Sequence, residues 1–143
     1  MMHRVLTPLF VVAALCLLQI GCSEPTGTDD TIEPTFSSIE KNVFAKSCAT
    51  SSCHGTLGQR GGLVLTGTGI YDNLVSARPE NETARAKGLL RVAPGKPDSS
   101  FLIIKLTGPR ADEGERMPVG NEPIDAKAIE AIRTWIANGA PRN

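Results

Sequence analysis

The sequence predicts a mainly α-helical fold: a single domain of about three to five helices over residues 36–143, joined by long, glycine-rich loops. Three observations favour this fold. Apolar residues recur at helical spacing near both ends of the domain, and glycine is concentrated between Gly55 and Gly69. Only five aromatic residues are available within the domain, which is few for a core of this size.

Residues 1–21 have the pattern of a signal peptide of an exported protein. A short positive head precedes an apolar stretch from Val5 to Ile20. This stretch is at the short end of what spans a bilayer, and it contains Pro8 and Gln19. We therefore expect cleavage rather than a retained transmembrane helix.

The end of this segment, Leu18-Gln19-Ile20-Gly21-Cys22, resembles a bacterial lipobox. The resemblance implies that Cys22 is lipidated and becomes the first residue of the mature protein, and Ser23 implies the outer membrane. Residues 22–35 are polar and acidic and cannot bury a core, so they are expected to form a flexible tether. The expected location is outside the cytoplasm, anchored by lipid to a membrane and facing the periplasm.

The first helix of the domain is expected from about Ser37 to Lys46. Its apolar residues fall at i, i+3, i+7 and i+8: Phe36, Ile39, Val43 and Phe44. Such a helix would deliver Cys48 directly from its end.

The middle of the domain is expected to contain shorter elements. Residues 62–66 are expected to be extended, and residues 71–75 and 82–90 each to form a helical turn or more. A third helix is predicted from Ser99 or Ser100 to Leu106, with Asp98 as a possible cap. A short buried strand is the competing interpretation, because residues 102–104 are apolar and partly β-branched.

The last helix is the most strongly patterned element of the chain. Asp125 is placed to cap its amino end, and Gly139 to end it. Its apolar face is expected to comprise Ala128, Ile129, Ile132, Trp135 and Ile136.

Charge excludes one class of partner. The chain has 15 Lys and Arg residues against 15 Asp and Glu residues, so it lacks the basic excess of a nucleic-acid-binding protein. One local basic cluster comprises Arg78, Arg85, Lys87, Arg91 and Lys96. A solvated surface is favoured there over a docking patch for an acidic redox partner.

The segment from Cys48 to His54 carries the clearest chemical signal. Two cysteine thiols can add to the two vinyl groups of haem, and a histidine directly after the second cysteine is placed to bind the iron. Four residues separate Cys48 from Cys53, whereas most c-type haem motifs have two.

Three other interpretations of this segment compete with haem attachment. Cys48 and Cys53 would be the only thiols left after cleavage and acylation, so in an oxidising compartment they are expected to form either a disulfide or two thioether links. A zinc site would lack its fourth ligand, and a nucleophilic cysteine is disfavoured because a neighbouring thiol would pair with it.

Met117 provides the second part of the signal. Apart from the leader, His54 is the only histidine and Met117 the only methionine of the chain. Met117 lies in a polar segment with no periodic apolar neighbours, so a ligand role is favoured over core filling. His and Met together are the axial pair of an electron-transfer haem.

Several short motifs, taken in order, resemble a class I cytochrome c domain, and more narrowly the planctomycete-type cytochrome c family. They cover nearly all of residues 36–143: Cys53-His54-Gly55, Gly61-Gly62-Leu63, the segment from Arg91 to Pro97, Ser100-Phe101-Leu102, Arg116-Met117-Pro118, and the segment from Trp135 to Ala140. The resemblance implies helices wrapped around one covalently attached haem c, whose bulk would complete the thin core.

The same resemblance implies an electron carrier rather than an enzyme. Cys48 and Cys53 would attach the haem, and His54 and Met117 would be the axial ligands of its iron. Redox proteins would be the partners. Arg91 is interpreted either as a propionate partner or as a surface residue, and Gly61 and Gly62 either as allowing close approach to the haem or as an ordinary turn.

Two rival functions stay open. One is a haem-free lipoprotein binding module with a Cys48–Cys53 disulfide. The other retains the haem but makes it catalytic or gas-sensing, with Met117 displaced.

Overall fold

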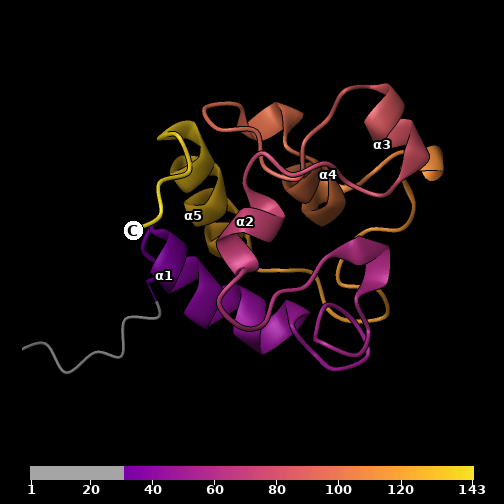
Figure 1. Cartoon of the computed structure of the whole chain (residues 1–143). Coiled ribbons are helices and arrows are strands. Elements are labelled where there is room, and N and C mark those ends of the chain that lie inside the picture. The colour runs from indigo at the N-terminus through magenta and orange to yellow at the C-terminus, as the bar shows by residue number, and fades with distance from the viewer. Residues whose placement is uncertain (1–30) are drawn as a thin grey trace, which may run out of the picture.

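The protein is described by a computed structural model that covers residues 31–143. The predicted signal peptide and the lipidation of Cys22 lie outside these residues, as does most of the tether. Within residues 31–143 the chain is mainly helical and contains no β-strand, which confirms the predicted class (Figure 1). The elements are α1 (Phe36–Ile39), the π-helix η1 (Glu40–Cys48), the 3-10 helix η2 (Arg60–Gly62), α2 (Ile70–Leu74), α3 (Glu82–Ala86), the 3-10 helix η3 (Pro97–Ser99), α4 (Phe101–Thr107), the 3-10 helix η4 (Ala111–Glu113) and α5 (Ala126–Ala137).

The first helix forms where the apolar spacing predicts it, but its winding changes along its length. Thr35 caps α1, because its Oγ1 accepts a hydrogen bond from the Ser38 amide at 3.3 Å. From Glu40 onward the winding widens to that of a π-helix, and the Ala49 amide donates to the Phe44 carbonyl, five residues earlier, at 2.8 Å. The helix ends at Cys48.

The last helix, α5, confirms the predicted boundaries. The Asp125 Oδ1 atom accepts from the Lys127 amide at 2.8 Å, and Gly139 adopts a φ of 92°, which ends the helix without the strain that a side chain would add. Ile132, Trp135 and Ile136 have no exposed surface.

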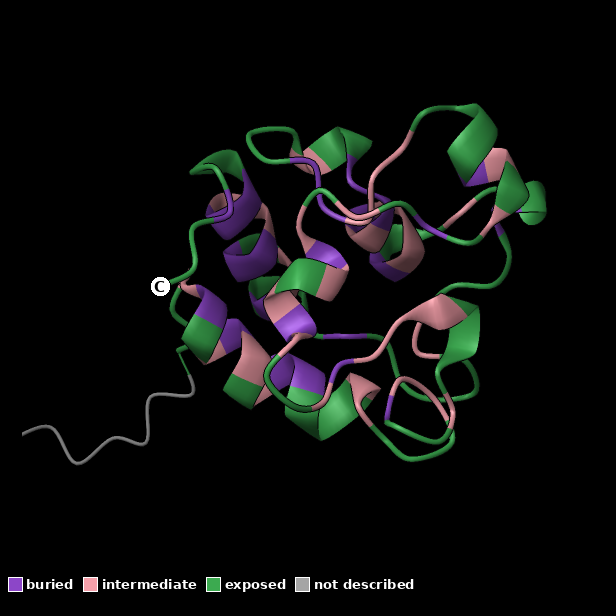
Figure 2. Ribbon diagram, viewed as in Figure 1, coloured by how far each residue is buried: buried purple, intermediate pink, exposed green. Residues whose placement is uncertain are grey.

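Helix α5 packs against α1 and brings the two ends of the domain together (Figure 1). The Phe36 and Trp135 rings have centroids 5.8 Å apart, and the indole Nε1 donates to the Pro141 carbonyl at 2.8 Å. Asn143 accepts the Phe36 amide on Oδ1 at 2.9 Å and the Ser37 amide on its backbone oxygen at 2.8 Å. Figure 2 shows the buried faces of these helices turned toward each other.

The third predicted helix exists as α4, so the competing strand interpretation of residues 102–104 is wrong. The proposed Asp98 cap is also wrong. Asp98 lies in η3, and its carboxylate pairs with Arg133 at 2.5 Å instead. Ser100 precedes α4, and its buried hydroxyl accepts from the Ala93 amide at 2.9 Å.

The middle of the chain is more irregular than its ends. Helix α2 forms about where it is predicted, whereas α3 stops at Ala86 rather than continuing toward Leu90. Leu90 and Val92 form isolated parallel bridges, with Ser100 and Val75 respectively, which require an extended backbone. No helix within residues 31–143 is long and apolar enough to cross a membrane.

Candidate functional site

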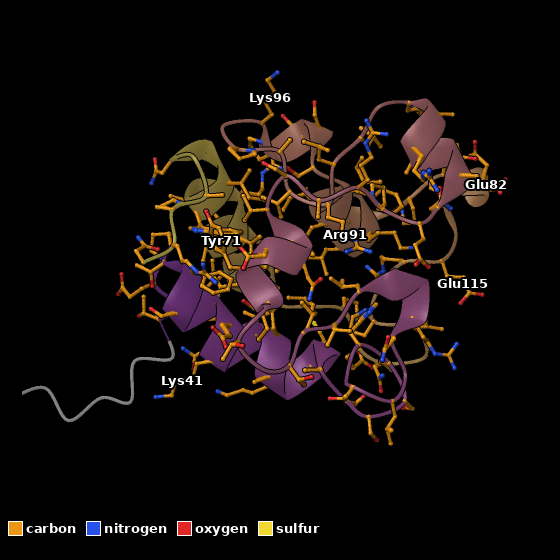
Figure 3. The ribbon with its side chains drawn as sticks, in the orientation of Figure 1. Lys41, Tyr71, Glu82, Arg91, Lys96 and Glu115 are labelled. Carbon is orange, nitrogen blue, oxygen red and sulfur yellow. The ribbon has the colours of Figure 1, made fainter. Side chains whose placement is uncertain are left out.

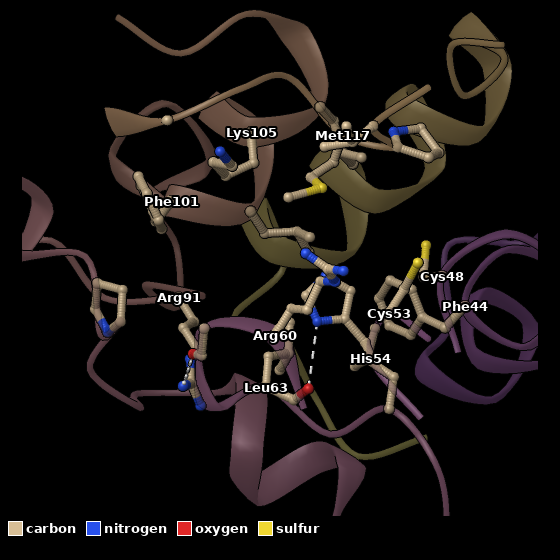
Figure 4. A pocket seen from close by; sticks show the side chains of 18 of the residues that line it. Phe44, Cys48, Cys53, His54, Arg60, Leu63, Arg91, Phe101, Lys105 and Met117 are labelled. Carbon is tan, nitrogen blue, oxygen red and sulfur yellow. Dashed lines mark hydrogen bonds between the residues drawn. The ribbon is translucent and has the colours of Figure 1, made fainter. Parts of the chain in front are cut away.

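A cavity of about 690 Å³ lies between η1, α4 and the loop that follows η4 (Figure 4). Cys48, Cys53, His54 and Met117 all line it. The fold therefore brings together four residues that the sequence singles out from two distant segments. The rest of the lining is largely apolar and includes Val43, Phe44, Leu63, Leu65, Leu74, Phe101, Leu102 and Leu106.

The imidazole of His54 is oriented by a backbone carbonyl. Its Nδ1 atom lies 3.3 Å from the Leu63 oxygen, which can only accept, so Nδ1 carries the proton and donates (Figure 4). The lone pair of Nε2 is then available to bind a metal. Burial lowers the pKa of His54, although the carbonyl partly opposes this, and the ring is therefore neutral at pH 7. A neutral, oriented imidazole is the state required of a metal ligand.

A compact turn produces the position of His54. The Cys53 and Gly55 amides both donate to the Thr50 carbonyl, at 3.0 and 2.9 Å, and the His54 amide donates to the Cys48 carbonyl at 3.2 Å. A Cβ atom on Gly55 would lie 2.8 Å from the Thr50 oxygen, so only glycine fits after the histidine. The four residues between the cysteines are thus accommodated in a hydrogen-bonded turn.

The two cysteines are free thiols in different environments. Burial, and secondarily the charge of Cys53, raises the pKa of the Cys48 thiol to about 11. Hydrogen bonds from the Thr50 and Ser52 hydroxyls lower the pKa of Cys53, so it is the more readily ionised of the two. Within residues 31–143, the disulfide required by the haem-free alternative is not present.

Met117 lies across the cavity from His54. Figure 4 shows its sulfur and the His54 ring turned toward the cavity from opposite sides. The Met117 amide donates to the Lys105 carbonyl of α4 at 2.8 Å, which attaches this loop to the helix. A thioether and an imidazole nitrogen therefore face the same space.

The rim of the cavity is fixed by Arg91. Its guanidinium donates to the Asn73 carbonyl at 2.9 Å and to the Gly61 carbonyl at 3.0 Å. Gly61 and Gly62 have φ values of 62° and 61°, a conformation that favours glycine. Arg91 is half-buried rather than a free surface residue, and the glycines shape the loop that leads to Leu63.

A buried carboxylate holds the loop that carries Met117. Only 4% of the Glu113 side chain is exposed, and it accepts from the Lys87 ammonium at 2.9 Å and from the Arg110 amide at 3.0 Å. These hydrogen bonds hold the pKa of Glu113 below its usual value, and the bond from Lys87 has the largest effect.

This carboxylate predicts a specific acid sensitivity. Because its pKa is lower in the folded state, ionised Glu113 stabilises the fold above about pH 4.3, the pKa of an unperturbed Glu. That stabilisation is lost as the pH falls through the lowered folded pKa. We expect the urea midpoint of the unmodified protein to fall more steeply below pH 4 than that of Glu113→Gln. Asp98→Asn, which removes an exposed ion pair, is the matched control and should keep the steep fall. Equal slopes for Glu113→Gln and the unmodified protein would contradict this role.

Two contributors to the site are not visible in the sequence pattern. Leu63 acts through its carbonyl, which every residue possesses, and Lys105 acts on the backbone of a loop ten residues away. Within residues 31–143, no group of three or more His, Cys, Asp or Glu side chains is arranged to hold a metal ion.

Comparison with known proteins provides no assignment. No protein-family model, curated protein or solved structure matches the chain. The resemblance based on the short motifs therefore stays a prediction.

Proposed function

We propose that residues 36–143 form a mono-haem c-type cytochrome that carries single electrons. Cys48 and Cys53 would attach the haem covalently, and His54 and Met117 would bind its iron from opposite faces. One observation carries the proposal most directly: the His54 ring, with Nδ1 held by the Leu63 carbonyl, and the Met117 sulfur enter one cavity from opposite sides.

The chemistry of the cavity fits this group. It offers a neutral imidazole nitrogen, a thioether and two thiols, which are the four contacts that a His- and Met-ligated haem c requires. Its volume lies within the usual range for sites of small molecules and cofactors, and its largely apolar lining suits a porphyrin ring.

The residues of the chain would determine how such a centre behaves. Haem iron supplies one-electron oxidation and reduction when bound. The Leu63 carbonyl orients His54 and increases the basicity of its ring, and the thioether of Met117 favours a higher potential than a second imidazole would. If His54 and Met117 both bound the iron, they would leave no coordination site for a substrate, which favours electron transfer over catalysis.

The proposal includes the setting inferred from the leader. With Cys22 lipidated, the domain would be held at the periplasmic face of a membrane and would exchange electrons with redox partner proteins.

Attachment can be tested directly. The full chain is produced in cells competent in cytochrome maturation and examined by haem-dependent peroxidase staining of a denaturing gel and by intact mass. We expect a stained band and the added mass of one haem. Cys48→Ala and Cys53→Ala should each retain at most one thioether link, and the double variant should lose the stain.

Ser51→Ala is the matched control, because Ser51 is exposed in the same turn and should keep full staining. An unstained band from the unmodified chain, with a mass two hydrogens below that of the reduced protein, would instead support the haem-free module with a Cys48–Cys53 disulfide.

A further inference from the structure

Lys105 makes an unusual set of contacts with the loop that carries Met117. Its ammonium donates to the Glu113 carbonyl at 3.1 Å and also to the Glu115 carbonyl. Its own carbonyl accepts the Met117 amide at 2.8 Å. A single residue of α4 thus binds three backbone groups within five residues of the loop.

The loop is shaped around this ammonium. Gly114 lies between the two carbonyls with a φ of 82°, and a Cβ atom added there would lie 3.2 Å from the Lys105 Nζ atom. A side chain at this position would therefore be strained and would press on the ammonium. Lys105 is half-buried, and its Nζ atom lies 5.9 Å from the centroid of the Phe101 ring.

The remaining attachments of the loop are made before Glu115. Lys87 binds the Glu113 carboxylate, and the Asn81 side chain donates to the Asp112 carbonyl at 3.3 Å. Glu115 and Met117 are held to α4 through Lys105. Their position relative to the cavity depends on that residue.

We propose that Lys105 is a positioning residue for Met117, which fixes the backbone on either side of Arg116 so that the Met117 thioether stays in the cavity. The proposal rests on the proposed function, because it concerns the distal ligand of the iron. The hydrogen bonds between Lys105 and this loop all go to backbone groups, so Lys105 would act on Met117 through the loop. Without its ammonium, the loop loses two charge-assisted hydrogen bonds, one at Glu113 and one at Glu115. The backbone before Arg116 is then no longer held, and the sulfur loses its fixed position.

The test compares Lys105→Met, which keeps the apolar stem and removes the donors, with Lys105→Arg, which retains donors. Lys41→Met is the matched control, because Lys41 is exposed and points into solvent on the first helix (Figure 3). Two quantities are measured on the purified full chain: the long-wavelength Met-to-iron absorption band of the oxidised protein, and the hydrogen-exchange rate of the Met117 amide.

We expect Lys105→Met to keep its haem by mass, to lose most of the Met-to-iron band, and to exchange the Met117 amide at least about tenfold faster. Lys105→Arg should recover part of both signals, and Lys41→Met should match the unmodified protein. If Lys105→Met does not fold, Gly114→Ala replaces it, since that change disturbs the same contact from the loop side and should weaken the same two signals.

If folded Lys105→Met kept the Met-to-iron absorption band at full intensity and an unchanged exchange rate of the Met117 amide, the proposed role of Lys105 would be overturned. This outcome is distinct from failure of the proposed function, which would appear as an unmodified chain without haem. In that case the exchange rate still tests whether Lys105 fixes the backbone of Met117, and equal rates in the unmodified protein and the variant would reject it.

Discussion

In the protein with Met117→Leu, we expect the haem to stay attached and the reduction potential to fall on the order of 0.1 V or more, within the roughly 0.8 V that axial ligation spans. Leucine preserves the apolar volume that Met117 contributes to the cavity but offers no electron pair to iron. The Met-to-iron absorption band of the oxidised protein should vanish. Both quantities can be measured by a redox titration followed by absorption spectroscopy.

Glu122→Gln serves as the control for Met117→Leu, because Glu122 is an exposed residue a short distance along the chain. Its potential and spectrum should match those of the unmodified protein. An unmodified protein that binds haem but never shows the band would exclude Met117 as a ligand, and would favour the catalytic or gas-sensing alternative, in which this position of the iron is open.

The Trp135→Ala variant should lose about 3–5 kcal/mol of unfolding free energy, which is the usual cost of truncating a fully buried large aromatic residue. Trp135 has no exposed surface, packs against the Phe36 ring, and donates to the Pro141 carbonyl. Truncation would leave a cavity between α1 and α5 and an unpaired carbonyl. Urea unfolding at neutral pH measures the change.

The control for Trp135→Ala is Leu57→Ala. Leu57 is 87% exposed, so its truncation should change the unfolding free energy by less than about 0.5 kcal/mol. A loss below about 1.5 kcal/mol at Trp135 would contradict a core centred on the contact between α1 and α5.

The ends of the fold could be predicted from the sequence because their signals are local. The apolar spacing of the first and last helices depends on residues within a few turns, and Asp125 caps α5 through a bond to an amide two residues away. The change of η1 to a π-helix could not be predicted, because the same apolar residues fit either winding and tertiary packing decides between them.

Asp98 illustrates a competing contact that local sequence does not reveal. It stands before an apolar run, as a cap would, yet Pro97 begins a 3-10 turn there and Arg133 from α5 takes the carboxylate. The Asp98 carboxylate thus pairs with a side chain 35 residues away instead of capping the nearby backbone amides at the start of α4. Helix α3 ends at Ala86, where Gly88 adopts a φ of 70° and turns the chain, and the backbone of Leu90 then pairs with Ser100.

The candidate site likewise contains some residues that could be predicted from the sequence and some groups that could not. Cys48, Cys53, His54 and Met117 could be found because each is a rare residue type with few other uses in this chain. The Leu63 carbonyl and the Lys105 ammonium could not, because one is a backbone group and the other is one of many basic residues. Their roles follow only from where the loops after Gly61 and Gly114 return to the cavity.

The pairing of Asn143 with Phe36 and Ser37 has a consequence for engineering the molecule. The two ends of the domain meet at the start of α1, whereas Cys48 enters the cavity at the far end of the same continuous helix. A short linker from Asn143 to Thr35 would therefore close residues 35–143, without the preceding segment, into a circle on the side away from the cavity. New termini could then be opened at an exposed loop, and a surface or electrode coupled there would approach the cavity from a chosen direction.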